Sequence, residues 1–150
     1  MNFINRFLIK KTRAKQIQDS WMLLDSKDSL NLLKKGVFEP FETHLSKKIV
    51  CRDNTVIDIG ANVGYYTLIF SKLVGENGKV IGCEPDPENF KILKKNIELN
   101  GCKNVVIINK AISDYEGKSS LYLCDDNKGD HRLYDSHDHR VSIPVSATYI

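Results

Sequence analysis

The spacing of three short apolar runs constrains the fold of this chain more than any other feature. The runs occupy residues 55–59, 79–83 and 104–108, and successive runs start about 25 residues apart. Runs that are apolar on both faces are typical of parallel strands covered by helices on each side. Connections between such strands are right-handed, which fixes much of the topology. The spacing therefore predicts a βαβαβ unit built on a parallel sheet.

Helices are predicted between these strands. The first covers about residues 62–73 and ends near Gly75. The second begins where Asp86 can cap it and Pro87 can occupy its first turn, and it ends at Gly101. Helical spacing predicts that its buried stripe consists of Phe90, Leu93 and Ile97.

The flanking segments carry weaker patterns. Residues 1–35 predict an N-terminal helical arm of one or two amphipathic helices, and residues 36–150 form the expected main domain. At the start of that domain, apolar residues spaced by four predict a short helix leading into the core: Phe41, Leu45 and Ile49. Residues 121–124 and 141–145 resemble strands, and Pro144 places the second at a sheet edge because proline donates no ladder hydrogen bond.

The composition fits one soluble globular domain. The chain has 150 residues, of which 41% are hydrophobic and 27% are charged, and its formal net charge is +3. This charge is too small to indicate nucleic acid as a partner. We interpret a basic cluster near the N-terminus as a solvated helix face: Lys10, Lys11, Arg13 and Lys15. Because the apolar stretch at residues 3–9 is too short and too polar for a membrane span, we expect a cytoplasmic protein without stable membrane insertion.

A glycine-containing turn follows the first predicted strand. Gly60 permits a tight turn, Gly64 allows a ligand to approach the backbone, and the helix beyond offers free N–H groups to an anion. The dinucleotide fingerprint is G-x-G-x-x-G, whereas this loop is G-x-x-x-G with Asn62 in place of the middle glycine. Asp58 places a carboxylate where it can hold the cationic amino group of a methionine moiety, directly or through water. The loop therefore favours S-adenosyl-L-methionine over a dinucleotide.

A second acidic residue, Glu84, lies at the end of the second predicted strand, 20 residues after Gly64. Its carboxylate can accept hydrogen bonds from both hydroxyls of a ribose. NAD needs the same contact, so Glu84 indicates a nucleoside without naming the cofactor. After the third strand, backbone groups can meet an adenine edge and apolar side chains can stack on its face; the candidates are Lys110, Ala111 and Ile112.

Four stretches of the chain closely resemble the FkbM-type methyltransferases: VIDIGANVGYYT at 56–67, EPD at 84–86, EPFE at 39–42 and GDHR at 129–132. The similarity covers roughly residues 36–145. It implies an α/β fold, namely the Rossmann-like αβα domain of class I methyltransferases, with a mostly parallel sheet. It also implies S-adenosyl-L-methionine as cofactor and a hydroxyl of a sugar or another small molecule as methyl acceptor.

The same resemblance assigns the cofactor site. It implies that Asp58, Gly60 and Gly64 shape the methionine end and that Glu84 binds the ribose. Together with the neighbouring motif positions, the predicted cofactor-binding set is Asp58, Gly60, Ala61, Asn62, Gly64, Tyr65, Glu84, Pro85 and Ala111.

One departure from the family concerns the end of the chain. Family members continue into a fourth parallel strand with an acidic loop, in the sheet order 3-2-1-4-5-7-6, and nothing similar follows Ile150. The strand at 55–59 would then be a bare apolar edge, which invites pairing. We expect a domain that stops before its fourth strand: a shortened form, a split gene product or a decayed gene copy. Its edge would self-associate or bind a complementing C-terminal half, unless the strand at 141–145 covers it.

The catalytic base is the least constrained prediction. A hydroxyl acceptor needs a group that takes its proton, and the candidates are His131, His137 and His139, with Asp130 or Asp135 to orient one of them. His131 is our candidate, against the alternative that these histidines are merely solvated. No metal site is expected, and the cysteines are interpreted as buried free thiols: Cys51, Cys83, Cys102 and Cys124.

Three hypotheses stay open at this point. The chain is a small-molecule O-methyltransferase, or a non-catalytic cofactor-binding or interaction fragment derived from such an enzyme, or a nucleotide-dependent oxidoreductase. Binding of a methyl donor without turnover favours the second, and competition by NAD favours the third.

Overall fold

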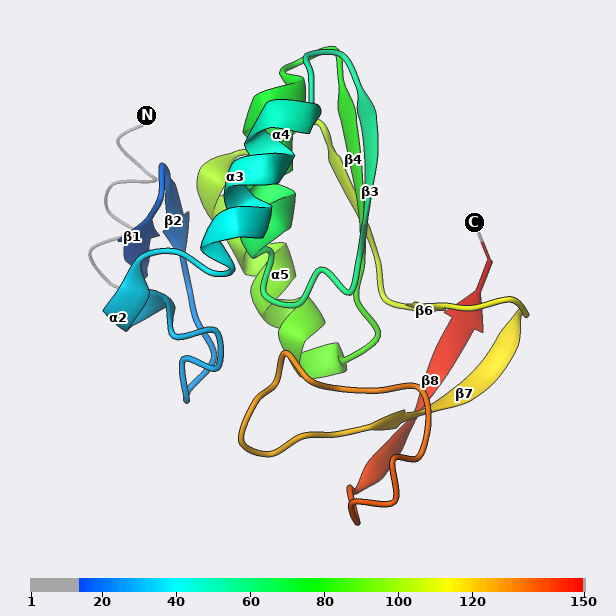
Figure 1. Cartoon of the computed structure of the whole chain (residues 1–150). Coiled ribbons are helices and arrows are strands. Elements are labelled where there is room, and N and C mark those ends of the chain that lie inside the picture. The colour runs from blue at the N-terminus through cyan, green and yellow to red at the C-terminus, as the bar shows by residue number, and fades with distance from the viewer. Residues whose placement is uncertain (1–13, 150) are drawn as a thin grey trace.

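The computed structural model describes residues 14–149, and these contain the predicted alternation of strands and helices (Figure 1). The central elements are β3 (Thr55–Ile59), α4 (Tyr65–Val74), β4 (Lys79–Cys83), α5 (Pro87–Asn100) and β5 (Val105–Ile108). The three strands are parallel and lie in the order β3-β4-β5. The predicted βαβαβ unit is confirmed, and its first two strands have the predicted bounds.

Local sequence signals set the helix ends. The Asp86 side chain accepts hydrogen bonds from the backbone N–H groups of Glu88 and Asn89, and Gly101 ends α5 in the left-handed conformation. Helix α4 begins at Tyr65, three residues later than predicted, because the glycine loop occupies the residues before it. Gly64 has a φ of 95° there, and a Cβ atom on it would lie 2.7 Å from Cδ1 of Leu93.

One face of the parallel sheet is bare within residues 14–149. Helices α4 and α5 cover the other face, as Figure 1 shows. In the sheet register Ile57 pairs with Ile81 and Ile81 with Val106, so these three side chains form a row across the bare face. Ile57, Val106 and Ile59 are 41%, 47% and 62% exposed. The described chain therefore contains one of the two helical layers that an αβα domain has. In the order β3-β4-β5, strand β3 is an edge of the sheet.

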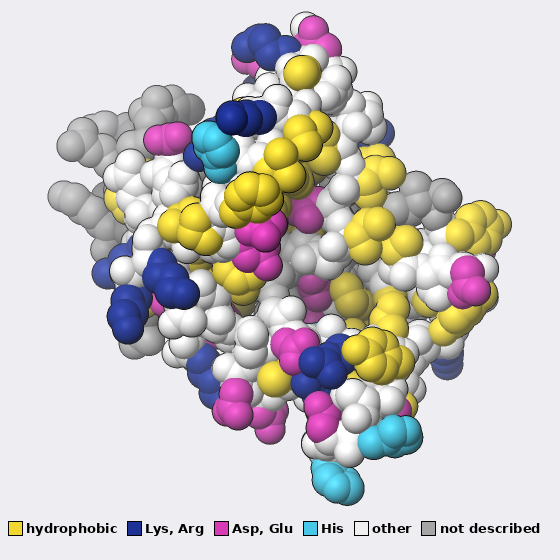
Figure 2. Space-filling view, viewed as in Figure 1, with side chains coloured by type: hydrophobic (Ala, Val, Ile, Leu, Met, Phe, Trp, Pro, Cys, Tyr) yellow, Lys and Arg dark blue, Asp and Glu magenta, His cyan; other side chains and the backbone are white. Residues whose placement is uncertain are grey.

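Helix α3 (Pro40–Ile49) forms as predicted, but its apolar stripe does not lead into the core. Phe41, Leu45 and Ile49 are 71%, 42% and 64% exposed. The buried residue of α3 is Thr43, whose hydroxyl donates to the Phe38 carbonyl. Anchoring through Thr43 turns the apolar stripe outward, and Figure 2 shows hydrophobic side chains gathered over this part of the surface.

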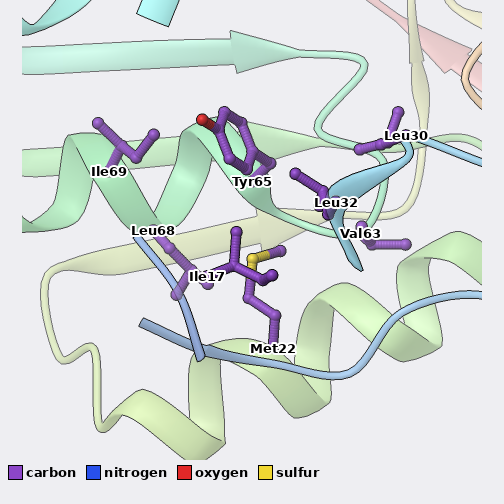
Figure 3. Close-up of a cluster of buried hydrophobic side chains, with 8 residues drawn as sticks. All are labelled: Ile17, Met22, Leu30, Leu32, Val63, Tyr65, Leu68 and Ile69. Carbon is purple, nitrogen blue, oxygen red and sulfur yellow. The ribbon is translucent and has the colours of Figure 1, made fainter. Parts of the chain in front are cut away.

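The predicted N-terminal helical arm is wrong for the described residues 14–35. A hairpin of β1 (Lys15–Ile17) and β2 (Ser20–Met22) precedes the short helix α2 (Leu32–Lys35), while residues 1–13 lie outside the described residues. This segment forms strands although its apolar residues have helical spacing, because the hairpin buries Ile17 and Met22 in the main core. Figure 3 shows that core, which also contains Leu30, Leu32, Val63, Tyr65, Leu68 and Ile69.

A second small sheet follows β5. It contains β6 (Ala111–Ile112), β7 (Gly117–Tyr122) and β8 (Ser142–Thr148) in the order β6-β8-β7. Pro144 thus lies in the middle strand, contrary to the predicted edge, but β6 pairs with β8 only at Ala147 and Thr148. At Pro144 the strand has one neighbour, so proline's missing N–H leaves no ladder bond unmade. Since β8 pairs with β6 and β7, the alternative that it covers β3 is wrong.

None of the helices within residues 14–149 combines the length and the apolar character that crossing a membrane requires.

Candidate functional site

A pocket of about 190 Å³ opens at the carboxyl ends of β3 and β4. Ligands of open α/β sheets bind at this end of the strands. The loops that follow β3, β4 and β5 line the pocket, and residues 128–133 of the β7–β8 connection close another side. Figure 1 shows this connection passing beneath the N-terminal end of α5.

Glu84 is the fixed acidic group of the pocket. One of its carboxylate oxygens accepts a hydrogen bond from the Asn62 backbone N–H at 2.7 Å, and the other accepts from the Asp86 backbone N–H at 2.8 Å. The residue is 4% exposed. The two N–H groups hold the carboxylate in one orientation and leave each oxygen with capacity to accept again.

Burial raises the pKa of Glu84 to about 7, although its two backbone hydrogen bonds act in the opposite direction. Nearby Asp86 also raises this pKa, and His131 lowers it. The carboxyl of Glu84 therefore changes its charge near neutral pH, so any ligand that needs the ionised form binds in a pH-dependent manner.

The structure brings together five members of the predicted cofactor-binding set. These pocket-lining residues are Gly60, Asn62, Glu84, Pro85 and Ala111. Lys110 and Ile112, the candidates for adenine contact, line the pocket as well.

Four other members of the predicted set are not among the residues that line the pocket. Asp58 is 8% exposed and accepts a hydrogen bond from the Thr67 hydroxyl at 2.5 Å, so its carboxylate is held by α4. Burial raises the pKa of Asp58, and the Thr67 bonds oppose that rise. Tyr65 is a core residue whose hydroxyl lies 3.2 Å from Oγ1 of Thr43. Ala61 and Gly64 are buried within the loop.

Two side chains that the sequence did not single out organise the pocket. The Asn109 amide donates to the carbonyls of Glu84 and Pro85 at 2.7 and 3.2 Å, which ties the loop after β5 to the loop after β4. The Asn89 amide donates to the Lys128 carbonyl at 3.3 Å. No local period marks these contacts in advance, because the asparagines and their carbonyl partners lie between 24 and 39 residues apart in the sequence.

His131 lies at the pocket wall with both ring nitrogens engaged. Its Nδ1 accepts from the Cys124 backbone N–H at 3.0 Å, so the proton resides on Nε2, which lies 2.9 Å from a carboxylate oxygen of Asp86. The imidazole is 9% exposed. Neither nitrogen is free to take a proton from an acceptor in this arrangement.

The other histidines of this connection, His137 and His139, are exposed and do not line the pocket. Asp130 pairs with Arg132 and Arg140 instead of orienting a histidine. Among residues 14–149 no group of three potential ligands can hold a metal ion. All four cysteines are free thiols; Cys83 is buried, whereas Cys51 is exposed, contrary to expectation.

Residues 41–121, more than half of the chain, match the model of one protein family, the TRM5/TYW2 methyltransferase domain. The chain belongs to the TRM5/TYW2 methyltransferase domain family. The match runs from α3 into β7 and therefore contains the complete βαβαβ unit of this TRM5/TYW2 domain, together with the loops that follow β3, β4 and β5.

Curated relatives of the TRM5/TYW2 domain match shorter stretches. The protein-L-isoaspartate O-methyltransferase of Methanococcoides burtonii is 37% identical over 54 residues, which are 36% of this chain and 27% of that protein. The tRNA wybutosine-synthesizing protein 2 homolog of Danio rerio is 40% identical over 55 residues, which are 36% of this chain and 13% of that protein. The chain thus spans about a quarter or less of these relatives' lengths.

Among solved structures, P. horikoshii TYW2 in complex with MeSAdo is similar to this chain, with a TM-score of 0.51 and 26% sequence identity. The similarity covers 70% of this chain and 38% of that protein. The fold is accordingly the Rossmann-like fold of class I S-adenosylmethionine-dependent methyltransferases, as the sequence predicted.

Proposed function

We propose that this chain binds S-adenosyl-L-methionine and serves as the cofactor-binding part of a methyltransferase. The observation that carries the proposal is the fixed Glu84 carboxylate, buried in a pocket at the carboxyl ends of β3 and β4. Each of its oxygens can accept one more hydrogen bond, which fits the two hydroxyls of a ribose. Membership of a methyltransferase family supports the same assignment.

In this proposal each pocket residue contacts a different part of the cofactor. Gly60 and Asn62 lie beside the methionine end, Glu84 holds the ribose, and the backbone at Ala111 meets the adenine. Asp58 and Gly64 then act from outside the pocket. Asp58 fixes the first turns of α4 through Thr67, and the close approach of Gly64 to Leu93 sets the position of the loop.

Bound S-adenosyl-L-methionine supplies a methyl group attached to a cationic sulfur. Transfer of that group requires an acceptor oxygen in line with the methyl carbon, so the contribution of this chain is to orient the donor. A base for the acceptor must come from a group other than His131 while both of its ring nitrogens are engaged.

Equilibrium dialysis with radiolabelled S-adenosyl-L-methionine tests the choice of cofactor. Unlabelled S-adenosylhomocysteine is expected to displace the label, whereas NAD at the same concentration is not. Displacement by NAD with equal strength would instead support the oxidoreductase hypothesis.

For the acceptor we propose a hydroxyl of a sugar or another small molecule, on the strength of the FkbM-type motifs at residues 56–67 and 84–86. A second candidate is a nucleotide of RNA, because the matched family includes TYW2 and one relative is a tRNA wybutosine-synthesizing protein 2 homolog. Transfer of label from the donor to sugars or to total tRNA distinguishes them. Cofactor binding with no transfer to any acceptor would favour the alternative of a non-catalytic binding module.

The bare edge of β3 supports a proposal about partners. Its backbone groups on one side have no partner strand among residues 14–149, and the apolar row of Ile57, Ile81 and Val106 lies next to it. We propose that a further strand and helix cover this surface, supplied by a second copy of the chain or by a complementing polypeptide. The four free thiols fit a reducing compartment, which supports a cytoplasmic location.

A further inference from the structure

Residues 124–131, which we call the strap, form one wall of the pocket although they are distant in sequence from its glycine loop. Lys128, Gly129 and His131 of the strap line the pocket. The strap folds on itself, since Asn127 accepts hydrogen bonds from the backbone N–H groups of Gly129 and Asp130, both at 2.9 Å. It is therefore an ordered segment that faces the pocket.

Three side chains from the βαβαβ unit hold the strap. The amides of Asn62 and Asn89 both donate to the Lys128 carbonyl, at 3.0 and 3.3 Å. Asp86 accepts from Nε2 of His131 at 2.9 Å. Asn62 belongs to the glycine loop, and Asp86 and Asn89 belong to the N-terminal end of α5, so the strap bridges two loops of the pocket.

The link between His131 and Asp86 is shielded from water. The two side chains are 9% and 7% exposed, so water competes weakly for their hydrogen bond. Burial alone would raise the pKa of Asp86, but its hydrogen bonds to His131 and to the Glu88 N–H lower it below the ordinary value. Asp86 stays ionised and holds helix and strap together.

The pocket beside the strap is small for a nucleoside. Its volume is about 190 Å³, whereas pockets for drug-sized ligands occupy roughly 300 to 1,000 Å³. A complete nucleoside with an amino-acid tail needs more room than the closed strap leaves. Such a ligand extends beyond the pocket into solvent unless the strap moves outward to admit it.

We propose that the strap gates the cofactor pocket and that the His131–Asp86 hydrogen bond is the latch that holds it closed. His131 is thus a positioning residue. This inference rests on the proposed function, because it takes S-adenosyl-L-methionine or its product as the gated ligand.

Hydrogen exchange of the ligand-free chain tests the latch without any cofactor. In His131→Asn the shorter side chain can still accept from the Cys124 N–H but does not reach Asp86. We expect amides of residues 124–131 to exchange about tenfold faster, as the loss of a hydrogen bond to a charged group predicts, while amides of β3 and β4 keep their protection. Unchanged exchange in the strap would overturn the latch.

A second variant breaks the same bond from the other side. Asp86→Asn keeps an oxygen to cap α5 but can place an N–H group against the N–H of His131. We expect the amides of residues 124–131 to exchange as fast in Asp86→Asn as in His131→Asn. His137→Asn is the control, because His137 is 90% exposed in the same connection and asparagine tolerates its φ of 58°.

The rate at which S-adenosylhomocysteine dissociates, followed by stopped-flow fluorescence, tests the gate. Both latch variants are expected to release it about tenfold faster than the wild type, and the double variant no faster than either one, because one bond is lost in all three. Wild-type rates in the latch variants would overturn the gating role. No binding by the folded wild-type chain would contradict the proposed function itself, and the gate with it.

Discussion

At the scale of single residues, the buried carboxyl of Glu84 opposes the folded state when it is ionised. Its pKa is about 7 in the folded chain against an ordinary value of 4.5. The folded chain therefore keeps a proton that the unfolded chain releases between these pH values, and the free energy of unfolding falls by up to roughly 3 kcal/mol as pH rises through that window. A buried carboxyl that lowers the free energy of unfolding in this way is a candidate for a functional role.

Binding should show the opposite pH dependence. Ribose hydroxyls donate to an ionised carboxylate, so we expect the affinity for S-adenosylhomocysteine to rise about tenfold between pH 6 and pH 8 as Glu84 loses its proton. Calorimetry over this range measures it. Glu84→Gln should bind weakly with little pH dependence, and a pH dependence that persists in Glu84→Gln would assign it to another group.

Gly64 provides a test of the loop itself. Gly64→Ala would place a Cβ 2.7 Å from Leu93 at a φ of 95°, so we expect a loss of about 3 kcal/mol in the free energy of unfolding, measured by urea denaturation. Gly36→Ala is the matched control, since Gly36 also has a positive φ of 67° but open space around it. Equal losses at both positions would show that the contact with Leu93 is unimportant.

At the residue scale, the sequence predicts which residues lie together where the backbone alone sets their positions. Glu84 and Gly60 lie at strand ends, and any parallel sheet brings such ends to one edge, so their shared pocket was predictable. Asp58 differs because alternate strand residues point to opposite faces, and its neighbour Thr67 on α4 accounts for its orientation. The partner of His131 was not predictable, because Asp86 lies 45 residues earlier and the spacing shows no period.

At the scale of elements, α5 does more than cover the sheet. The amide of Asn96 accepts from the Leu23 N–H at 2.7 Å and donates to the carbonyls of Leu23 and Val63 at 2.9 and 2.8 Å. Asn100 makes the equivalent pair of bonds to the backbone of Trp21. The two side-chain amides thus hydrogen-bond backbone groups of Trp21 and Leu23 as a neighbouring strand would. These bonds favour an extended backbone here over the predicted helical arm.

Replacing Asn96 should weaken the attachment of the N-terminal hairpin to α5. Asn96→Leu removes the partner of one buried and two half-buried backbone groups, so we expect the free energy of unfolding to fall by about 3 kcal/mol in urea denaturation. Exposed Lys95→Leu on the same helix should change it by less than about 0.5 kcal/mol. A small effect of Asn96→Leu would mean that the hairpin is held by its apolar contacts alone.

At the scale of the whole molecule, the described chain exposes two groups of large apolar side chains. The bare sheet face and the outward stripe of α3 lie on the surface drawn in Figure 2. Such patches usually mark an interaction site or cause aggregation. The sequence predicted the bare edge of β3, but it did not predict the outward stripe of α3, because periodicity alone cannot tell which layer will cover a helix.

Self-association should therefore depend on this face. Ile57→Lys combined with Val106→Lys is expected to keep the fold and to abolish concentration-dependent association in sedimentation velocity. Val141→Lys is the control, since Val141 is 69% exposed in the β7–β8 connection. A wild-type chain that stays monomeric would favour the complementing polypeptide over a second copy.

The central claim is that Glu84 and the glycine loop form a cofactor site. Calorimetric titration of the chain with S-adenosylhomocysteine at pH 8 tests it most directly, beside Glu84→Ala and an exposed control, Glu88→Ala. We predict saturable binding with one site in the wild type and in Glu88→Ala, and a loss of at least about tenfold in affinity in Glu84→Ala. Equal binding by Glu84→Ala, or no binding by the folded wild type, would contradict the account.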